Sequence, residues 1–379
     1  MGVIYADNAA TTRLSDAAFD AMKPFLLEEY GNASTLYKLG RSAHKAVENA
    51  RSVFAKGINA LPAEIYFTSG GTESDNWAIK GTAHRLAASG KKHIVTDNIE
   101  HHAVLNSAKA LEREGFEVTY VSADNNGLVR AEDVAAAIRP DTAMVSVMFA
   151  NNELGTIQPV AEIGSICRSA GVLFHCDAVQ AAGILPIDVK AMNIDLLSIS
   201  AHKFHGPKGV GVMYARRGCV PETYIDGGEQ ERGHRAGTEN VAGIVGAAAA
   251  FAEAISERNE KADRLCAMRD EIQSGLLKIP GSQVNGVTAP RLPGTLNMSF
   301  DGIDGQSLIF ELDLKGLAAS SGSACASGSV DPSHVLLALG LPYKLAHGSL
   351  RLSLGKYNTS DEAEMIIRIV SDTVAELRG

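Results

Sequence analysis

Between residues 60 and 215 the chain alternates short apolar runs with longer segments of helical periodicity. The apolar runs lack the in–out alternation of a half-exposed strand, which indicates strands covered on both faces. They comprise residues 64–68, 93–96, 117–121, 143–149, 172–176, 196–200 and 209–214. The helical segments comprise residues 74–88, 103–114, 131–138 and 160–170. This alternation predicts a mostly parallel seven-stranded sheet with helices on both faces.

Beyond Gly233 the pattern changes to longer helices. Residues 239–255 form an Ala-rich apolar segment and residues 260–277 a charged amphipathic one, so both are predicted to be helices. Residues 281–292 are rich in Pro and Gly, which is typical of a loop.

An α+β unit is predicted after this loop. Its two strands and three helices are expected at residues 295–300 and 349–354 and at residues 306–312, 334–339 and 361–377. We therefore expect a large domain over residues 15–257 and a small domain made of residues 1–14 and 258–379.

The composition is that of an ordinary globular protein and argues against several classes of function. Of the 379 residues, 45% are hydrophobic and 21% are charged, and the net charge of −9 gives no support for nucleic-acid binding. No window approaches the roughly 20 apolar residues that span a bilayer. The first residues lack a basic region followed by an apolar one, so we expect no signal peptide.

The cysteine pattern indicates free thiols. The number of cysteines is odd and no pair has Cys-x-x-Cys spacing, which argues against a disulfide framework and a zinc ribbon. A reducing cytoplasm is the expected location. The five cysteines are Cys167, Cys176, Cys219, Cys266 and Cys325.

A strand, two glycines and a helix start follow one another in the sequence FTSGGTES at residues 67–74. A helix N-terminus exposes unpaired N–H groups and a partial positive charge, and glycine lets an anion approach the backbone closely. The turn at Gly70, Gly71 and Thr72 is thus a candidate phosphate site. An ordinary turn capped by Thr72 explains the pattern equally well, and no P-loop Gly-Lys-Ser/Thr follows.

Asp177 follows another buried strand, at the edge where open α/β sheets place their ligands. A carboxylate there can pair with a protonated pyridine nitrogen, and Gln180 can reach a phenolic oxygen on the same ring. A role as the cap of the next helix explains Asp177 as well. His175 and Cys176 are expected to pack in the core.

Lys203 lies in the segment SISAHKFHGPKG, where a buried strand ends in polar residues before a Gly–Pro turn. A lysine near a cofactor aldehyde can form a Schiff base, and burial lowers the pKa of a lysine from about 10.4 toward useful values. Ser200 and His202 are candidate phosphate contacts. An exposed loop lysine is the alternative, which the flanking His and aromatic residues disfavour.

Cys325 lies in the run SSGSACASGS at residues 320–329, whose composition predicts a mobile loop. Mobility suits a nucleophile that must reach a buried substrate and then present its cargo elsewhere, and the thiolate is the reactive form of cysteine. A buried structural cysteine is the alternative, but a Ser- and Gly-rich segment offers little apolar surface to bury it.

Several further polar residues give weaker signals. They are His101 and His102 at a helix start, Asn152 after a strand, Thr238 before a helix and Arg351 within a strand. Adjacent histidines do not make a metal site without further ligands, so we expect no metal ion.

Taken in order, these motifs resemble those of the NifS/IscS-like cysteine desulfurases of group I. The resemblance runs from Tyr5 to Ser353 and includes GGTESDN, EHHAV, NNELG, HCDAVQ, SAHKFHGPKG, RAGTEN and SSGSACASG. These are fold-type-I enzymes of aminotransferase class V that use pyridoxal 5′-phosphate (PLP). The resemblance implies an α/β large domain that binds PLP and a smaller α+β domain that carries the Cys325 loop.

The resemblance also implies cofactor roles. Lys203 is expected to form the Schiff base and to move the substrate α-proton, with Asp177 on the pyridinium and Gln180 on the phenolic oxygen. His101 is expected to stack on the ring and shuttle a proton. Phosphate and further cofactor contacts are expected from Gly71, Thr72, Asn152, Ser200, His202 and, from the second subunit of a homodimer, Thr238.

For the reaction, the resemblance implies that Asn152 and Arg351 orient L-cysteine, with Arg351 forking onto its carboxylate. The Cys325 thiolate is expected to attack the substrate sulfur, so that alanine leaves and Cys325 carries a persulfide. The expected acceptor is an iron–sulfur scaffold or another sulfur-acceptor protein, and transient cluster ligation by Cys325 is part of this expectation.

Two departures from the family pattern and two alternatives accompany this hypothesis. The run Gly31-Asn32-Ala33-Ser34 replaces the usual Asn-Pro-Ser, and the chain ends at Gly379 without the extension by which longer members dock a scaffold. The alternatives are a lyase or selenocysteine enzyme, and a sulfur-relay protein without activity.

Overall fold

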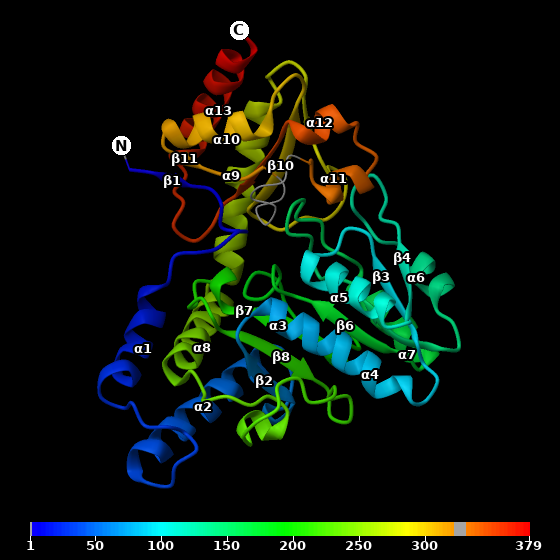
Figure 1. The fold of residues 1–379 in the computed structure, drawn as a ribbon. Coiled ribbons are helices and arrows are strands. Elements are labelled where there is room, and N and C mark those ends of the chain that lie inside the picture. Colours follow the sequence, from blue (N-terminus) through cyan, green and yellow to red (C-terminus); the bar gives the residue numbers. More distant parts are fainter. Residues whose placement is uncertain (1, 322–330) are drawn as a thin grey trace.

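A seven-stranded sheet dominates the computed structural model, which describes residues 2–321 and 331–379 (Figure 1). In spatial order its strands are β2 (Ile65–Thr68), β8 (Gly211–Ala215), β7 (Leu196–Ser200), β6 (Leu173–Asp177), β5 (Thr142–Ser146), β3 (His93–Asp97) and β4 (Glu117–Val121). All neighbouring strands are parallel except the two pairs that involve β8. The predicted mostly parallel sheet is confirmed.

Successive residues of the strands face opposite sides of the sheet, and each side has its own apolar core. Phe67 and Val95 belong to one core, whereas Tyr66 and Ile94 belong to the other. The first side is covered by α1 (Asp16–Leu27), α2 (Lys38–Gly57), α6 (Ala131–Ala137), α7 (Val160–Ala170) and α8 (Val241–Ser256). The second is covered by α3 (Gly71–Asn76), α4 (Thr82–Ala87) and α5 (His102–Arg113).

The helix predicted over residues 74–88 begins earlier and is not uniform. It starts at Gly71, and a π-helical turn over Trp77–Gly81 separates α3 from α4. The Trp77 indole donates to the carbonyl of Glu222 at 2.7 Å. Helices α1 and α2 were not among the elements that the pattern predicted.

A second, smaller sheet occupies the upper part of Figure 1. Its antiparallel strands are β12 (Ser349–Ser353), β10 (Thr295–Phe300) and β9 (Ser282–Val284), packed with α9 (Arg258–Leu276), α10 (Gly305–Leu314) and α13 (Glu362–Arg378). Beside it β1 (Ile4–Tyr5) pairs in parallel with β11 (Leu317–Ala318). The prediction of a loop over residues 281–292 is wrong at β9, because β10 offers this segment its backbone hydrogen bonds.

Several separate parts of the sequence contribute residues to the apolar cores of the two sheets. Phe251 of α8 lies in a core of the large sheet, whereas Leu265 of α9 and Ile4 lie in that of the small sheet. Helices α11 (His334–Ala338) and α12 (Tyr343–His347) return to the large sheet's core. A domain boundary near residue 258 stays a prediction. In the described part of the chain, no helix combines the length and apolar character needed to cross a membrane.

Candidate active site

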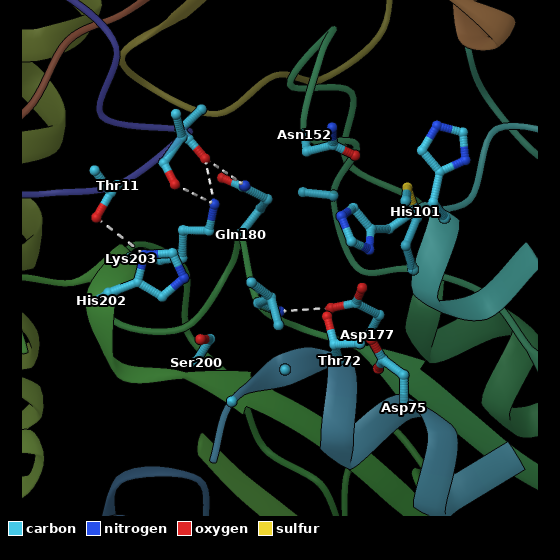
Figure 2. A pocket seen from close by; sticks show the side chains of 18 of the residues that line it. Thr11, Thr72, Asp75, His101, Asn152, Asp177, Gln180, Ser200, His202 and Lys203 are labelled. Atoms are coloured by element: carbon cyan, nitrogen blue, oxygen red, sulfur yellow. Dashed lines mark hydrogen bonds between the residues drawn. The ribbon is translucent and has the colours of Figure 1, made fainter. Parts of the chain in front are cut away.

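A cavity of about 580 Å³ lies at the carboxyl ends of the central parallel strands and reaches β12 (Figure 2). It brings together ten residues that the sequence singled out. They are Gly71, Thr72, His101, Asn152, Asp177, Gln180, Ser200, His202, Lys203 and Arg351.

The turn into α3 forms one end of the cavity. A Cβ atom at Gly71 would lie 2.5 Å from Cγ2 of Val179, so only glycine fits there without a shift. The Thr68 hydroxyl donates to the carbonyl of Gly70 at 3.1 Å and pairs with the Ser74 hydroxyl at 2.8 Å, which fixes the turn. The backbone N–H groups at the start of α3 therefore border a space that an anion can approach.

His202 lies at the same end and is neutral at physiological pH. Burial lowers its pKa to about 4, aided by Lys203 and Lys208. Its Nδ1 pairs with the Thr11 hydroxyl at 3.1 Å. An imidazole held in this way is suited to a hydrogen bond with a phosphate oxygen.

An ion pair ties the start of α3 to the segment before α8. Arg235 donates from Nε and Nη2 to the two carboxylate oxygens of Glu73, at 2.7 and 3.1 Å. Burial opposes the charge of Glu73, but the hydrogen bonds from Arg235 and from the Ser69 N–H outweigh it and lower the pKa of Glu73. Thr238 follows in this segment, yet it does not line the cavity.

Lys203 lies in a 3₁₀ turn directly after β7, and its side chain faces the N-terminal segment (Figure 2). Its Nζ donates to the carbonyls of Ala9 and Ala10, at 2.5 and 2.9 Å. The Gln180 amide donates to the same Ala9 carbonyl at 3.1 Å. The amine is therefore held at the cavity wall, within a few side-chain rotations of its interior.

Asp177 ends β6 in a buried nest of carboxyl groups. Its Oδ1 accepts the Val179 N–H at 2.8 Å, yet burial raises the pKa of Asp177 to about 6. Burial also raises the pKa of Asp97 to about 7, and it raises those of Asp75 and Glu100 well above their usual range. Several uncompensated carboxylates cannot coexist at such burial, so a cation beside Asp177 would stabilise its charged form.

His175 of β6 bridges the neighbouring strands β5 and β7, and its Nε2 lies 3.7 Å from Oδ1 of Asp75 in this nest. Its two ring nitrogens pair with the hydroxyls of Ser146 and Ser198, at 2.8 and 3.0 Å. Burial lowers its pKa to about 3. The expectation that His175 packs in the core agrees with its complete burial.

His101 caps the N-terminus of α5 and borders the same space as Asp177. Its Nδ1 accepts the N–H of Ala103 at 3.1 Å, so the neutral ring carries its proton on Nε2. Burial lowers its pKa to about 4, aided by Lys203, His102 and His334. Ligand atoms of Asp75, His101 and Asp177 lie within 4.8 Å of one another.

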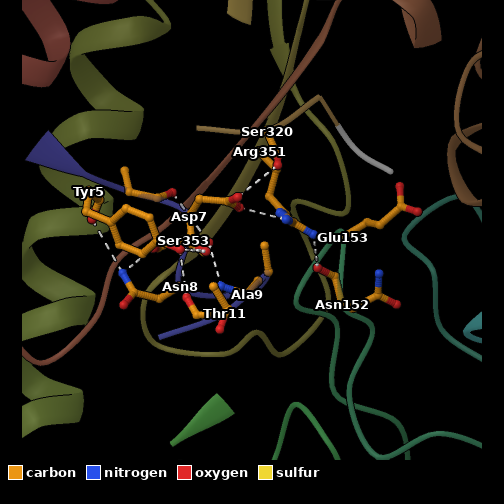
Figure 3. A network of polar contacts seen from close by, with 12 residues as sticks. Tyr5, Asp7, Asn8, Ala9, Thr11, Asn152, Glu153, Ser320, Arg351 and Ser353 are labelled. Atoms are coloured by element: carbon orange, nitrogen blue, oxygen red, sulfur yellow. Dashed lines mark hydrogen bonds and ion pairs between the residues drawn. The ribbon is translucent and has the colours of Figure 1, made fainter. Parts of the chain in front are cut away.

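Arg351 enters the cavity from β12, where it lies between Asp7 and Asn152 (Figure 3). Its Nη2 lies 2.8 Å from Oδ1 of Asp7, and its Nη1 donates to the carbonyl of Asn152 at 2.9 Å. The side chain is only 2% exposed. This is a fixed cation at the edge of the cavity, suited to a carboxylate.

The comparisons with known proteins agree with this geometry. The family model "Aminotransferase class-V" matches residues 4–366. "Cysteine desulfurase IscS" of Methanosarcina thermophila is 50% identical over 376 residues, which cover 99% of this chain and 93% of that protein. The protein of that name from Clostridium botulinum is 49% identical over 378 residues, which cover 99% of this chain and 95% of that protein.

The chain belongs to the NifS/IscS cysteine desulfurase family, within aminotransferase class V. A solved structure named "NIFS-LIKE PROTEIN" superposes on this desulfurase with a TM-score of 0.93 at 40% identity, covering 99% of this chain and all of that one. DndA from Streptomyces lividans superposes with a TM-score of 0.79 at 37% identity, covering 91% of this chain and 97% of that one. The predicted family and its fold type I are therefore confirmed.

Of the other predicted site residues, Thr238 does not line the cavity of this desulfurase in the single chain, and Cys325 lies outside the described residues. The last residues before the undescribed segment and the first ones after it both contact the cavity rim. The Ser320 hydroxyl donates to Oδ2 of Asp7 at 3.1 Å, and the Ser333 hydroxyl donates to Glu153.

The sequence reasoning missed several residues of the site. Asp7 and Thr11 lie in the opening segment that the family resemblance covers, but nothing local connects them with Arg351 or His202. His334 also lines the cavity, with its ring centroid 4.7 Å from that of His102. Only the tertiary contacts could identify these side chains.

Proposed function

We propose that this desulfurase holds PLP in the cavity, takes the sulfur of L-cysteine onto Cys325 and releases alanine. The supporting observation is that Lys203 and Asp177, from the ends of β7 and β6, line one cavity together with the turn at Gly70, Gly71 and Thr72. An amine, a carboxylate and an anion site at one sheet edge form the donor set that a phosphorylated pyridine aldehyde requires.

The donor set fits the polar groups of PLP. Asp177 would pair with the protonated ring nitrogen, a cation that favours the charged form of this buried carboxyl. Gln180 is the candidate contact of the phenolic oxygen, and Lys203 would hold the aldehyde carbon. When bound, PLP supplies an electron sink for the charge that develops at the substrate α-carbon.

The phosphate would lie at the α3 turn. Gly71 keeps the backbone open there, and the N–H groups of Gly71 and Thr72 would face the phosphate. Ser200 and His202 would add hydroxyl and imidazole contacts from the adjoining strand end. We extend this proposal to Thr238 of the partner subunit in a homodimer, because Thr238 does not line the cavity of its own chain.

Two groups would move or hold protons at the substrate. Lys203 would take the α-proton, because its amine lies against the cavity wall near Ala9 and Ala10. His101 would donate from Nε2 to the alanine carbon, which keeps the electron pair of the C–S bond when the sulfur passes to Cys325, because its Nδ1 is occupied by the Ala103 N–H.

Arg351 would bind the substrate carboxylate, with Asn152 beside it, and so orient the thiol toward the incoming Cys325. Three of the four described cysteines are buried, so they are poor nucleophiles, and burial raises the pKa of the Cys176 thiol well above its usual value. The persulfide would pass to an iron–sulfur scaffold or another acceptor protein, in the cytoplasm.

Mass spectrometry of the Cys325 peptide tests the proposal. After incubation with PLP and L-cysteine, the peptide is expected to gain one sulfur atom, and Cys325→Ala is expected to abolish alanine formation in turnover. The matched control is Cys266→Ala, which removes a half-buried thiol and leaves the persulfide. A lyase would instead keep its full rate in Cys325→Ala.

Loss of colour gives a second, independent measurement. The purified protein is expected to absorb in the visible range through its bound PLP, and Lys203→Ala is expected to lose the covalent link to the cofactor. Protein that stays colourless after reconstitution with PLP would support the sulfur-relay alternative.

A further inference from the structure

The guanidinium of Arg351 already forms an ion pair with a carboxylate of the same chain (Figure 3). Asp7 Oδ1 lies 2.8 Å from its Nη2, and its Nε is buried without a hydrogen-bond partner among the described residues. A buried cation is costly unless an anion accompanies it. Asp7 therefore stabilises Arg351 when the cavity holds no substrate.

The contact between Asp7 and Arg351 is single rather than forked. Only one oxygen of Asp7 meets the guanidinium, and the other accepts the Ser320 hydroxyl at 3.1 Å. The side chain of Asp7 is 17% exposed, whereas that of Arg351 is 2% exposed. The acid is therefore the partner that can be replaced, while strand β12 fixes the base.

A second acid already faces the same cation. Glu153 is fully buried and accepts the Ser333 hydroxyl, and burial raises its pKa although Ser333 and Arg351 oppose the change. A substrate carboxylate would bring a third acid to one guanidinium. A carboxylate bound to Arg351 would lie close to the Asp7 carboxylate, and like charges repel strongly in a buried site, so the newcomer has to displace Asp7 or bind against its charge.

We propose that Asp7 is a built-in competitor of the substrate carboxylate, which weakens the binding of every carboxylate ligand at Arg351. The inference rests on the proposed function, because it takes Arg351 as the substrate-carboxylate site. Its consequence is a higher KM for L-cysteine and a faster departure of alanine, whose carboxylate Asp7 replaces. A weaker affinity of the site for the substrate in its ground state favours turnover over ground-state binding.

The test compares three ligands in the PLP-loaded wild type and in Asp7→Asn, which keeps the size of the side chain. The KM for L-cysteine and the inhibition constant of L-alanine are expected to fall together, by about fivefold to tenfold. Cysteamine has the amine and the thiol but no carboxylate, so its inhibition constant is expected to stay unchanged. The kcat is expected to change less than the KM.

Two further variants separate charge from shape. Ser320→Ala removes only the hydrogen bond to Asp7 Oδ2 and is expected to move the same constants in the same direction, by less than Asp7→Asn. Asp7→Glu restores the charge and is expected to return them toward the wild-type values.

Each contrary outcome is distinct. A higher KM for L-cysteine in Asp7→Asn would mean that Asp7 orients Arg351 and would overturn the proposal, as would unchanged constants. Equal shifts for all three ligands, cysteamine included, would point to a change at the cofactor and would overturn it too. If the wild type forms no persulfide, the proposed function fails, and alanine binding followed by calorimetry still decides the role of Asp7.

Discussion

The two sides of the cavity solve opposite electrostatic problems. On the cofactor side, Asp177 and its neighbours are buried carboxyl groups, and burial raises their pKa values. On the substrate side, Arg351 is equally buried but meets Asp7 at 2.8 Å. Under the proposed function, the carboxyl groups of the first side gain a cationic partner only when a ligand binds. The guanidinium of the second side already has an anionic partner, Asp7, which a ligand would replace. Under the proposed function, this difference suits a cofactor that stays bound on the first side and a substrate that leaves the second.

The largest effect is expected on the cofactor side. Asp177→Asn removes the charge that holds the ring nitrogen protonated, so alanine formation is expected to fall by about 10²–10³-fold, the range seen when one preorganised electrostatic contact is lost. The matched control is Asp75→Asn, a buried carboxyl whose pKa is raised well above its usual range, which is expected to cost far less. Equal losses in both variants would contradict the special role of Asp177.

On the substrate side, Arg351→Ala is expected to raise the KM for L-cysteine by about 100-fold, since a buried charge contact with the substrate is lost. PLP content, measured from visible absorbance, is expected to stay unchanged. Arg351→Lys serves as the control, because it keeps the charge without the fork and is expected to lie between wild type and Arg351→Ala. A variant that loses PLP together with substrate affinity would show that the two sides are not separable.

A smaller effect is expected at the α3 turn. In Gly71→Ala the new methyl group meets Cγ2 of Val179 at 2.5 Å, so the dissociation constant of PLP is expected to rise by roughly tenfold, as for a modest overpacking. Fluorescence titration of the apoenzyme measures it. Val179→Ala in the same chain is expected to restore affinity, and failure of that rescue would exclude the steric explanation.

The smallest effect is a pH dependence of the apoenzyme. Burial raises the pKa of Asp97 to about 7 and that of Asp177 to about 6, above the unfolded value of about 3.9. Their protonated forms therefore stabilise the fold at low pH, and this contribution is lost as the pH rises from about 4 through 7. Thermal unfolding of Asp97→Asn is expected to show a flatter decline in Tm over that range than the wild type, by about a few degrees.

Residues whose place in the fold depends only on the local sequence pattern were predictable. The strand over residues 196–200 was predicted with its observed bounds, because a strand buried on both faces must be apolar throughout. Lys203 and Asp177 follow such strands directly, so their place at the sheet edge follows from the end of each run. Their catalytic roles stay predictions.

The direction of a strand and its neighbours in the sheet were not predictable from the residues of that strand. The β8 run has the same apolar character as its neighbours, yet it is antiparallel to both, because either direction satisfies the backbone hydrogen bonds. Helices α1 and α2 and the short β9 also escaped the pattern, since their burial depends on partners distant in the chain.

By itself, the sequence determined the seven strands of the large sheet and which of their ends carry polar groups, and it predicted which residues can bind a ring, a phosphate or a sulfur. The tertiary structure alone decided that Asp7 meets Arg351 across 344 residues. It also decided that the carboxyl groups around Asp177 are buried together and so lose their contact with water. Local pattern reports the burial of a segment, whereas the free energy of a charge depends on every group that the fold brings beside it.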